Sequence, residues 1–238
     1  MTRVWRGVYA LTSLLFHLSP WDIGKPQKAF LDVADQIRGS VLNTGCLSGE
    51  DALYFASRGH MVTGVDYSAE PISRAKQKAK ERGLSATFLV TDAALEDLAT
   101  VFDTVIDSGL FHVFSDEQRQ RYVEGLARVL KLGGVLYLLC FSDAEPGDLG
   151  PRRVSQKEIR YAFDDGWKIE AIEPSRFTGI KHDLPHISES TFSVGGPKAW
   201  FVVVRRTGWP GSVRGPGPIL DGDVPKETSA ALVAPRLF

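Results

Sequence analysis

Polar side chains follow four short apolar runs of this sequence, each at the point where the run ends. Asn43 leads into a glycine-containing turn, Asp66 and Asp92 follow the next two runs, and Asp107 with Ser108 follows the fourth. Each run has the length and composition of a buried strand. The carboxyl ends of parallel strands meet at one edge of an open α/β sheet, where such sheets bind ligands. The spacing therefore predicts a ligand pocket built from four successive strand ends.

The first of these sites is the stretch VLNTGCLSGE over residues 41–50. It reads as a strand, a tight turn carrying Gly45 and Gly49, and the start of a helix. Such a turn lets the backbone approach a ligand closely and aims helix N–H groups at it. Taken alone, a tight turn that binds no ligand is an equally good interpretation.

Asp66 lies about twenty residues beyond the turn, where an acidic residue can accept hydrogen bonds from both hydroxyls of a ribose. The other interpretation of Asp66 is a helix N-cap. Ser68 suits that position better, because it directly precedes the charged amphipathic stretch over residues 69–82. We therefore expect Asp66 to bind a nucleoside.

His112 lies just after the fourth run, in residues 109–114, at the edge where the ligand pocket is expected. The near-neutral reference pKa of histidine suits a general base. A histidine that is held by the backbone and shapes the pocket is an equally good interpretation. We interpret His17, His182 and His186 as surface residues.

Composition excludes several other classes of function. The net charge is −1, without the basic excess of a protein that neutralises many phosphates, so nucleic acid is not expected as a partner. The apolar runs are too short to span a membrane. Cys46 and Cys140 form no CxxC pair, and the paired acids of residues 164–165 and 221–223 lie in expected turns, so no metal site is predicted. We expect a cytoplasmic protein.

Hydrophobic periodicity predicts strands and helices that alternate along the chain, which is typical of a doubly wound α/β sheet. The expected helices cover residues 2–17, 27–38, 50–58, 69–82, 116–130 and 156–163. The expected strands begin at residue 41 and cover residues 61–65, 86–90, 102–106, 135–141, 167–172 and 199–205. Ser115 is expected to cap the helix that follows it.

Together these motifs resemble class I S-adenosylmethionine-dependent methyltransferases. The resemblance rests on residues 41–50, 64–68, 91–92, 102–114 and 130–136, and it extends over about residues 20–205. Residues 20–27 and 139–143 are similar to small bacterial enzymes, particularly actinobacterial ones. Those enzymes are related to thiopurine S-methyltransferase and to methyltransferases of quinones, heterocyclic toxins and other small metabolites. The family implies a Rossmann-like, seven-stranded, mostly parallel sheet whose last strand, residues 199–205, is antiparallel.

The resemblance also implies roles for individual residues. Gly45 and Gly49 would line the methionine and ribose side of the cofactor S-adenosylmethionine, and Asp66 would hold the ribose hydroxyls. Asp92 with Ala93 would meet the adenine, and Asp107 with Ser108 would lie below the donor methyl group. Trp21 would close over the pocket. The full predicted cofactor-binding set is Trp21, Asn43, Gly45, Cys46, Leu47, Gly49, Asp66, Tyr67, Asp92, Ala93, Asp107 and Ser108.

Two positions depart from the family's glycine motif. The motif begins with an acidic residue, where this chain has Asn43, and its middle glycine is Leu47 here. Losing the carboxylate removes a charge-assisted hydrogen bond worth about 1.5–3 kcal/mol. A leucine at this place is strained if its φ must be positive. Both changes weaken the expectation of tight cofactor binding.

The domains expected are an N-terminal helical cap (1–38), a methyltransferase domain (39–206) and a C-terminal tail rich in glycine and proline (207–238). The predicted activity is methyl transfer to O, N or S of a small aromatic or heterocyclic metabolite, by a monomer or homodimer. Aromatic residues would line its acceptor chamber, namely Trp21, Phe111, Phe114, Phe141 and Phe177.

The sequence leaves two alternatives to this activity. One is a methyltransferase-fold protein that binds its ligand without methyl transfer, as a cyclase-type enzyme or a regulatory subunit. The other, an NAD-dependent dehydrogenase, is disfavoured because the G-x-G-x-x-G fingerprint is absent: the matching residues are Gly45, Leu47 and Glu50.

Overall fold

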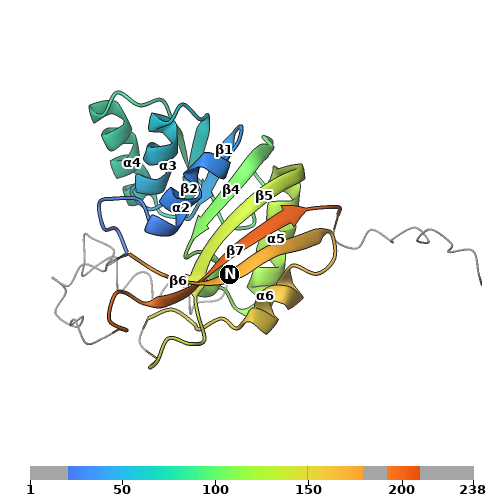
Figure 1. The fold of residues 1–238 in the computed structure, drawn as a ribbon. Helices are drawn as coiled ribbons and strands as arrows, with labels where there is room; N and C mark the ends of the chain where they lie inside the picture. The colour runs from blue at the N-terminus through green and yellow to red at the C-terminus, as the bar shows by residue number, and fades with distance from the viewer. Residues whose placement is uncertain (1–20, 149, 179–191, 210–238) are drawn as a thin grey trace, which may run out of the picture.

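One twisted sheet runs through the part of the chain that the computed structural model describes, residues 21–148, 150–178 and 192–209 (Figure 1). Its seven strands lie in the order β3-β2-β1-β4-β5-β7-β6. Their bounds are β1 (Val41–Thr44), β2 (Val62–Asp66), β3 (Thr87–Val90), β4 (Phe102–Ser108), β5 (Leu130–Phe141), β6 (Trp167–Arg176) and β7 (Lys198–Arg206). Only β7 pairs antiparallel to its neighbours, β5 and β6. The predicted sheet and its antiparallel last strand are confirmed.

Helices cover both faces of this sheet (Figure 1). One face packs against α2 (Lys28–Asp32), α3 (Glu50–Ser57) and α4 (Ala69–Glu81), and the other packs against α5 (Asp116–Val129) and α6 (Gln156–Ala162). The inner strands are buried on both faces, as in β1, where all four residues are buried. That double burial explains why these strands read as continuous apolar runs.

Reciprocal capping boxes fix where α5 and α6 begin. The Ser115 hydroxyl accepts the Gln118 amide while the Gln118 side chain accepts the Ser115 amide, and Ser155 with Glu158 repeats this pattern. Each box satisfies two backbone N–H groups that the first helical turn leaves free. The predicted cap at Ser115 is confirmed.

The structure departs from the expected elements in three places. The helix expected over residues 27–38 is broken: α2 ends at Asp32 and a 3-10 turn η1 (Ala34–Gln36) follows, because Val33 leaves the helical conformation. β5 begins at Leu130, before the two glycines, since Leu130 already pairs with Phe102. β6 continues to Arg176 through a proline, which the edge of a sheet tolerates. The helix expected over residues 2–17 lies outside the described residues, as do residues 210–238 of the expected tail.

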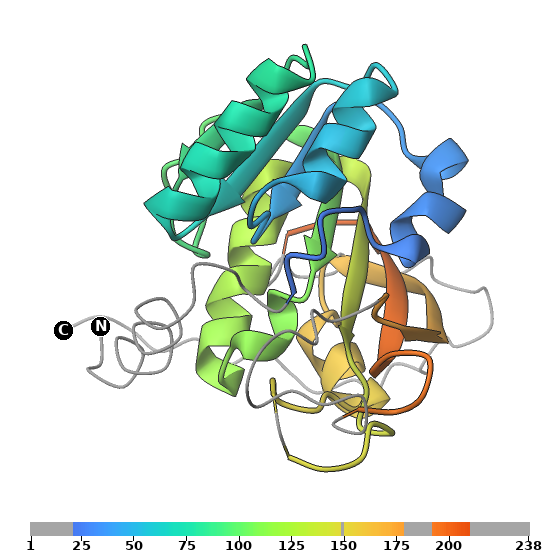
Figure 2. The same ribbon diagram turned by 90° about the vertical axis from the view of Figure 1, so that its left-hand side faces the viewer.

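The strand order reverses beside β1. The chain builds β1, β2 and β3 in one direction, then returns past β1 to place β4 on its other side. Such a reversal opens a crevice at the carboxyl ends of the two strands, where α/β sheets bind ligands. Figure 2 shows the segment that leads into α2, in dark blue, crossing in front of these strands.

Candidate cofactor and acceptor site

The turn after β1 adopts an alternating left-handed backbone. Gly45, Leu47 and Gly49 have φ values of 59°, 47° and 85°. Leu47 is therefore a leucine in a conformation that favours glycine, as expected if the family's backbone geometry is kept here. The Leu47 side chain is only half-buried, so it does not fill the core.

The two glycines also have a packing role. A Cβ on Gly49 would lie 2.9 Å from the Phe88 ring and 3.0 Å from the Ala75 methyl, and one on Gly45 would lie 3.1 Å from the Leu110 Cβ. Cys46, between them, is buried with a free thiol whose pKa is raised well above its ordinary value by burial and by Asp66. The turn is therefore pressed closely onto α4 and onto the loop after β4.

Asp66 holds the turn in this shape. Its Oδ2 accepts the Leu47 amide at 3.0 Å, and its Oδ1 accepts the Ser68 amide at 2.9 Å. Burial raises the pKa of the Asp66 carboxyl, although these backbone bonds oppose the rise. A carboxylate has about four acceptor positions, so capacity for ribose hydroxyls remains. Tyr67, next to it, is exposed.

Asn43 and Thr91 carry buried polar atoms that lack partners within the described structure, namely Asn43 Oδ1 and Thr91 Oγ1. Asn43 donates its amide to the Ile106 carbonyl at 3.3 Å, and only 1% of the residue is exposed. Buried polar groups are nearly always hydrogen-bonded, so each unsatisfied one requires an explanation. A bound ligand with a hydrogen-bond donor near Asn43 and a polar base near Thr91 would satisfy both atoms. S-adenosylmethionine, with an ammonium at one end and an adenine at the other, fits these two sites.

Asp92 and Ala93 form the turn after β3. The Asp92 side chain is exposed and its Oδ1 accepts the Ala94 amide at 2.9 Å, while Ala93 is half-buried. Leu95, which follows, has a φ of 56° and is buried. The predicted adenine contact thus lies in a constrained turn beside Thr91.

Asp107, expected below the donor methyl group, spends its carboxylate on contacts within the protein. It is fully buried, and its oxygens accept the amides of Leu110 at 2.7 Å and Phe111 at 3.0 Å and the Tyr122 hydroxyl at 2.8 Å. Burial raises the pKa of its carboxyl to about 7. These bonds fasten the loop after β4 onto α5, which leaves little of the carboxylate for a ligand. Ser108 lies at the end of β4 as expected.

Asp51 is a carboxylate at this edge that sequence reasoning missed. It is the second residue of α3, its Oδ1 accepts the Gln27 amide at 2.9 Å, and its carboxyl is hydrogen-bonded to the Ser108 side chain. The Gln27 side chain in turn accepts the Thr178 amide at 2.7 Å. The adjacent acids at 50 and 51 were the available signal, but helix starts are often acidic.

Aromatic rings gather where the N-terminal segment crosses the sheet. Trp21 lies 5.4 Å from Phe141, 6.1 Å from Phe177 and 6.1 Å from Phe192, measured between ring centroids. The predicted chamber residues Trp21, Phe141 and Phe177 are thus brought together, with Phe192 added. Phe111 and Phe114 are not part of this group, because they pack in the core on the opposite face.

His112 is stacked on Phe141 at 5.1 Å and lies inside this aromatic group. Its Nδ1 accepts the Phe141 amide at 3.0 Å, which places the ring proton of the neutral form on Nε2. Burial, with the nearby charges of Arg153 and Arg119, lowers its pKa to about 3. The ring is therefore neutral near pH 7 and offers a hydrogen-bond donor at Nε2. These contacts oppose the predicted role as a general base and favour the role in shaping the pocket.

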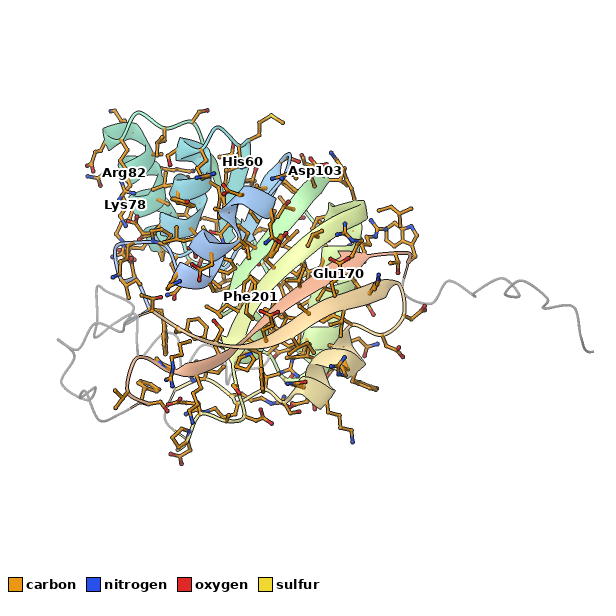
Figure 3. All side chains as sticks on the ribbon, in the orientation of Figure 1. His60, Lys78, Arg82, Asp103, Glu170 and Phe201 are labelled. Carbon is orange, nitrogen blue, oxygen red and sulfur yellow. The ribbon has the colours of Figure 1, made fainter. Side chains whose placement is uncertain are left out.

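Other polar clusters lie away from this edge. His60 and Asp103 are near the ends at which β1 and β4 begin, as Figure 3 shows. Among the described residues, no three His, Cys, Asp or Glu side chains are placed to hold a metal ion. The helices of that same part of the chain are too short or too polar to cross a membrane.

Comparison with known proteins identifies the class to which this site belongs. A family profile described as a methyltransferase domain matches residues 41–134. The 2-heptyl-1-hydroxyquinolin-4(1H)-one methyltransferase of Mycobacteroides abscessus is 38% identical over 163 residues, which cover 66% of this chain and 72% of that protein. The chain therefore belongs to the S-adenosylmethionine-dependent methyltransferases, and its cofactor is S-adenosylmethionine.

Solved structures share the fold of this chain. A structure from work on the conversion of a disulfide bond into a thioacetal group during echinomycin biosynthesis has a TM-score of 0.71 and 36% identity, covering 87% of this chain and 93% of that one. Magnesium protoporphyrin IX methyltransferase from Synechocystis PCC 6803, with S-adenosylmethionine bound, shares the fold at a TM-score of 0.56 and 22% identity, over 76% of each chain.

Proposed function

We propose that this methyltransferase transfers a methyl group to an O, N or S atom of a small aromatic or heterocyclic metabolite. The observation that carries the proposal is the group formed by Trp21, Phe141, Phe177 and Phe192, next to the cofactor edge of the sheet. Planar apolar rings are recognised by such aromatic walls. The relative from Mycobacteroides abscessus is named for a hydroxyquinolinone, which has this chemistry.

The cofactor supplies a methyl group that is already activated as a sulfonium, so the chain has to position the acceptor and exclude water. The residues of the proposed cofactor site are Asn43, the turn over residues 45–49, Asp66, Thr91 and residues 92–93. His112 holds its Nε2–H toward polar atoms of the acceptor rather than removing a proton. The acceptor therefore gives up its proton to the solvent before it enters the site, which favours acceptors that ionise near neutral pH.

We also propose that the enzyme is cytoplasmic, is a monomer or homodimer, and does not act on nucleic acid. The near-neutral net charge of −1 supports the last point. We likewise propose that the methyltransferase domain begins after residue 38 and ends at residue 206. The alternative of a protein that no longer transfers methyl groups gains no support from Leu47, because the turn keeps its left-handed backbone.

Methyl transfer with a labelled donor tests the proposal. The protein would be incubated with S-adenosylmethionine carrying a deuterated methyl group in four separate reactions. Each reaction contains one acceptor: a heteroaromatic N-hydroxy compound, an aromatic thiol, a phenol or total tRNA. We expect mass spectrometry to find one labelled methyl group on at least one small aromatic compound and none on tRNA. Labelling of tRNA alone, or of none of them while the cofactor binds, would contradict the proposal.

A further inference from the structure

Asp51 occupies the point where three parts of the cofactor edge meet. It lies two residues after Gly49 at the head of α3, it accepts the Gln27 amide of the N-terminal segment at 2.9 Å, and it is hydrogen-bonded to Ser108 at the end of β4. The strand order reverses between β1 and β4. The Asp51 carboxylate thus lies over the crevice itself, where the methionine end of the cofactor is expected beside the turn.

The cations near the start of α3 pair with the residue before Asp51 and not with Asp51 itself. Its neighbour Glu50 pairs with two cations of α4, Lys78 at 2.7 Å and Arg82 at 2.8 Å, both labelled in Figure 3. Among the ion pairs of the described residues, none includes Asp51. Burial raises the pKa of the Asp51 carboxyl to about 7. A half-buried carboxylate without a cation is unfavourable until a cationic ligand arrives.

Asn43 provides a second, independent sign of a missing donor at the same place. Its Oδ1 is buried and has no partner within the described residues, while its Nδ2 bonds the Ile106 carbonyl. Ile106 and Ser108 are two residues apart on β4, so Asn43 and Asp51 contact neighbouring points of one strand end. One acceptor there is neutral and the other is charged.

We propose that the Asp51 carboxylate binds the ammonium of the methionine portion of S-adenosylmethionine, together with Asn43 Oδ1. Asp51 thereby supplies the negative charge that the glycine motif lost when asparagine took the place of its acid. Asn43 contributes the neutral hydrogen bond, and Asp51 contributes the charge-assisted one, which is the stronger kind. The same carboxylate bonds the Gln27 amide, so cofactor binding and docking of the N-terminal segment share one residue.

Calorimetric binding of four ligands to the Asp51→Asn variant tests this assignment. Asparagine keeps an acceptor for the Gln27 amide, so the local fold is preserved. S-adenosylmethionine, its demethylated product and its decarboxylated form all carry the ammonium, whereas 5′-methylthioadenosine has the same nucleoside without it. We expect the first three to bind about tenfold to a hundredfold more weakly than to the unmodified protein. Binding of 5′-methylthioadenosine should change less than twofold.

Glu50→Gln is the matched control, because it removes the same charge one residue away, at a carboxylate that pairs with cations of α4. It should leave all four affinities within about twofold. Three results would overturn the proposal: unchanged binding of S-adenosylmethionine to Asp51→Asn, an equal loss for 5′-methylthioadenosine, or a loss for the sulfonium donor that spares its demethylated product. The third result would mean that Asp51 interacts with the sulfonium of the ligand and not with its ammonium.

Discussion

Leu47 keeps a glycine's backbone conformation with a leucine side chain. Left-handed φ costs a residue with a Cβ about 1–2 kcal/mol, and a new glycine loses about 0.5–1 kcal/mol through chain entropy. These two backbone effects oppose each other, and little packing is lost because the Leu47 side chain is only half-buried. We therefore predict that Leu47→Gly changes the free energy of unfolding by less than about 1 kcal/mol, measured by urea denaturation.

Leu95 is the matched control for this prediction, since it has the same sign of φ but a buried side chain. Leu95→Gly should destabilise the protein by about 2–5 kcal/mol, because the lost core contacts outweigh the relief of strain. Equal losses for the two variants would show that Leu47 packs as a core residue.

Asp66 should be indispensable for cofactor binding. Asp66→Ala removes a charged acceptor for the ribose and also the partner of the Leu47 amide. Each charge-assisted bond is worth about 1.5–3 kcal/mol, so we predict that affinity for S-adenosylmethionine falls at least about a hundredfold. Calorimetry measures this, with circular dichroism to check the fold. Unaltered affinity in a folded variant would remove Asp66 from the site.

Single residues were predictable where one strand end determines their place. Asp66 was expected beside the turn because it ends a strand about twenty residues after the glycines, a fixed distance in this architecture. Asp51 was not predictable, because its contacts depend on how the N-terminal segment folds back, through Gln27, onto the head of α3. The position of His112 just after β4 follows from the sequence, but the location of its ring proton depends on the Phe141 amide, a contact distant in sequence.

At the scale of elements, α5 approaches the adenine turn at Gly125. A Cβ there would lie 2.4 Å from the Ala94 carbonyl oxygen. Alanine improves helix propensity by up to about 1 kcal/mol, but a backbone clash of this kind costs about 1–3 kcal/mol. We predict that Gly125→Ala destabilises the protein and weakens S-adenosylmethionine binding severalfold, measured by denaturation and calorimetry.

Glu124→Ala serves as the comparison for this prediction, since Glu124 is exposed on the same helix. It should be neutral or slightly stabilising and leave cofactor affinity unchanged. If both variants behave alike, α5 does not support the adenine turn through Gly125.

Elements with a strong period were predicted well, and their ends less well. The strands of the sheet and α3 to α6 follow from apolar runs and amphipathic stretches that tertiary contacts reinforce. The helix over residues 27–38 is broken at Val33, which leaves the helical conformation, and buried Ile37 is already extended before β1. The early start of β5 depends on pairing with Phe102, which no local pattern encodes.

At the scale of the whole molecule, His112 makes stability depend on pH. An unfolded histidine has a pKa near 6.5, whereas that of folded His112 is lowered to about 3. The folded state therefore resists protonation, and its advantage is present above pH 6.5 and lost as pH falls toward 3. That loss approaches about 1.4 kcal/mol per pH unit.

We predict that His112→Asn, which keeps an acceptor for the Phe141 amide, lacks this loss. Asp51 and Asp107, whose raised pKa values contribute in the opposite direction, are present in both proteins and cancel in the comparison. The free energy of unfolding of the unmodified protein minus that of the variant should decrease from pH 7 to pH 4 in urea denaturation. A constant difference would mean that folded His112 is freely protonated.

The central claim is that a turn with asparagine and leucine in place of an acid and a glycine still holds S-adenosylmethionine. The most direct test is a calorimetric titration of the unmodified protein with S-adenosylmethionine, its demethylated product and NAD. Saturable binding of the first two, one per chain, with no heat from NAD, is the predicted result. Binding of NAD without binding of S-adenosylmethionine or its product would contradict the account.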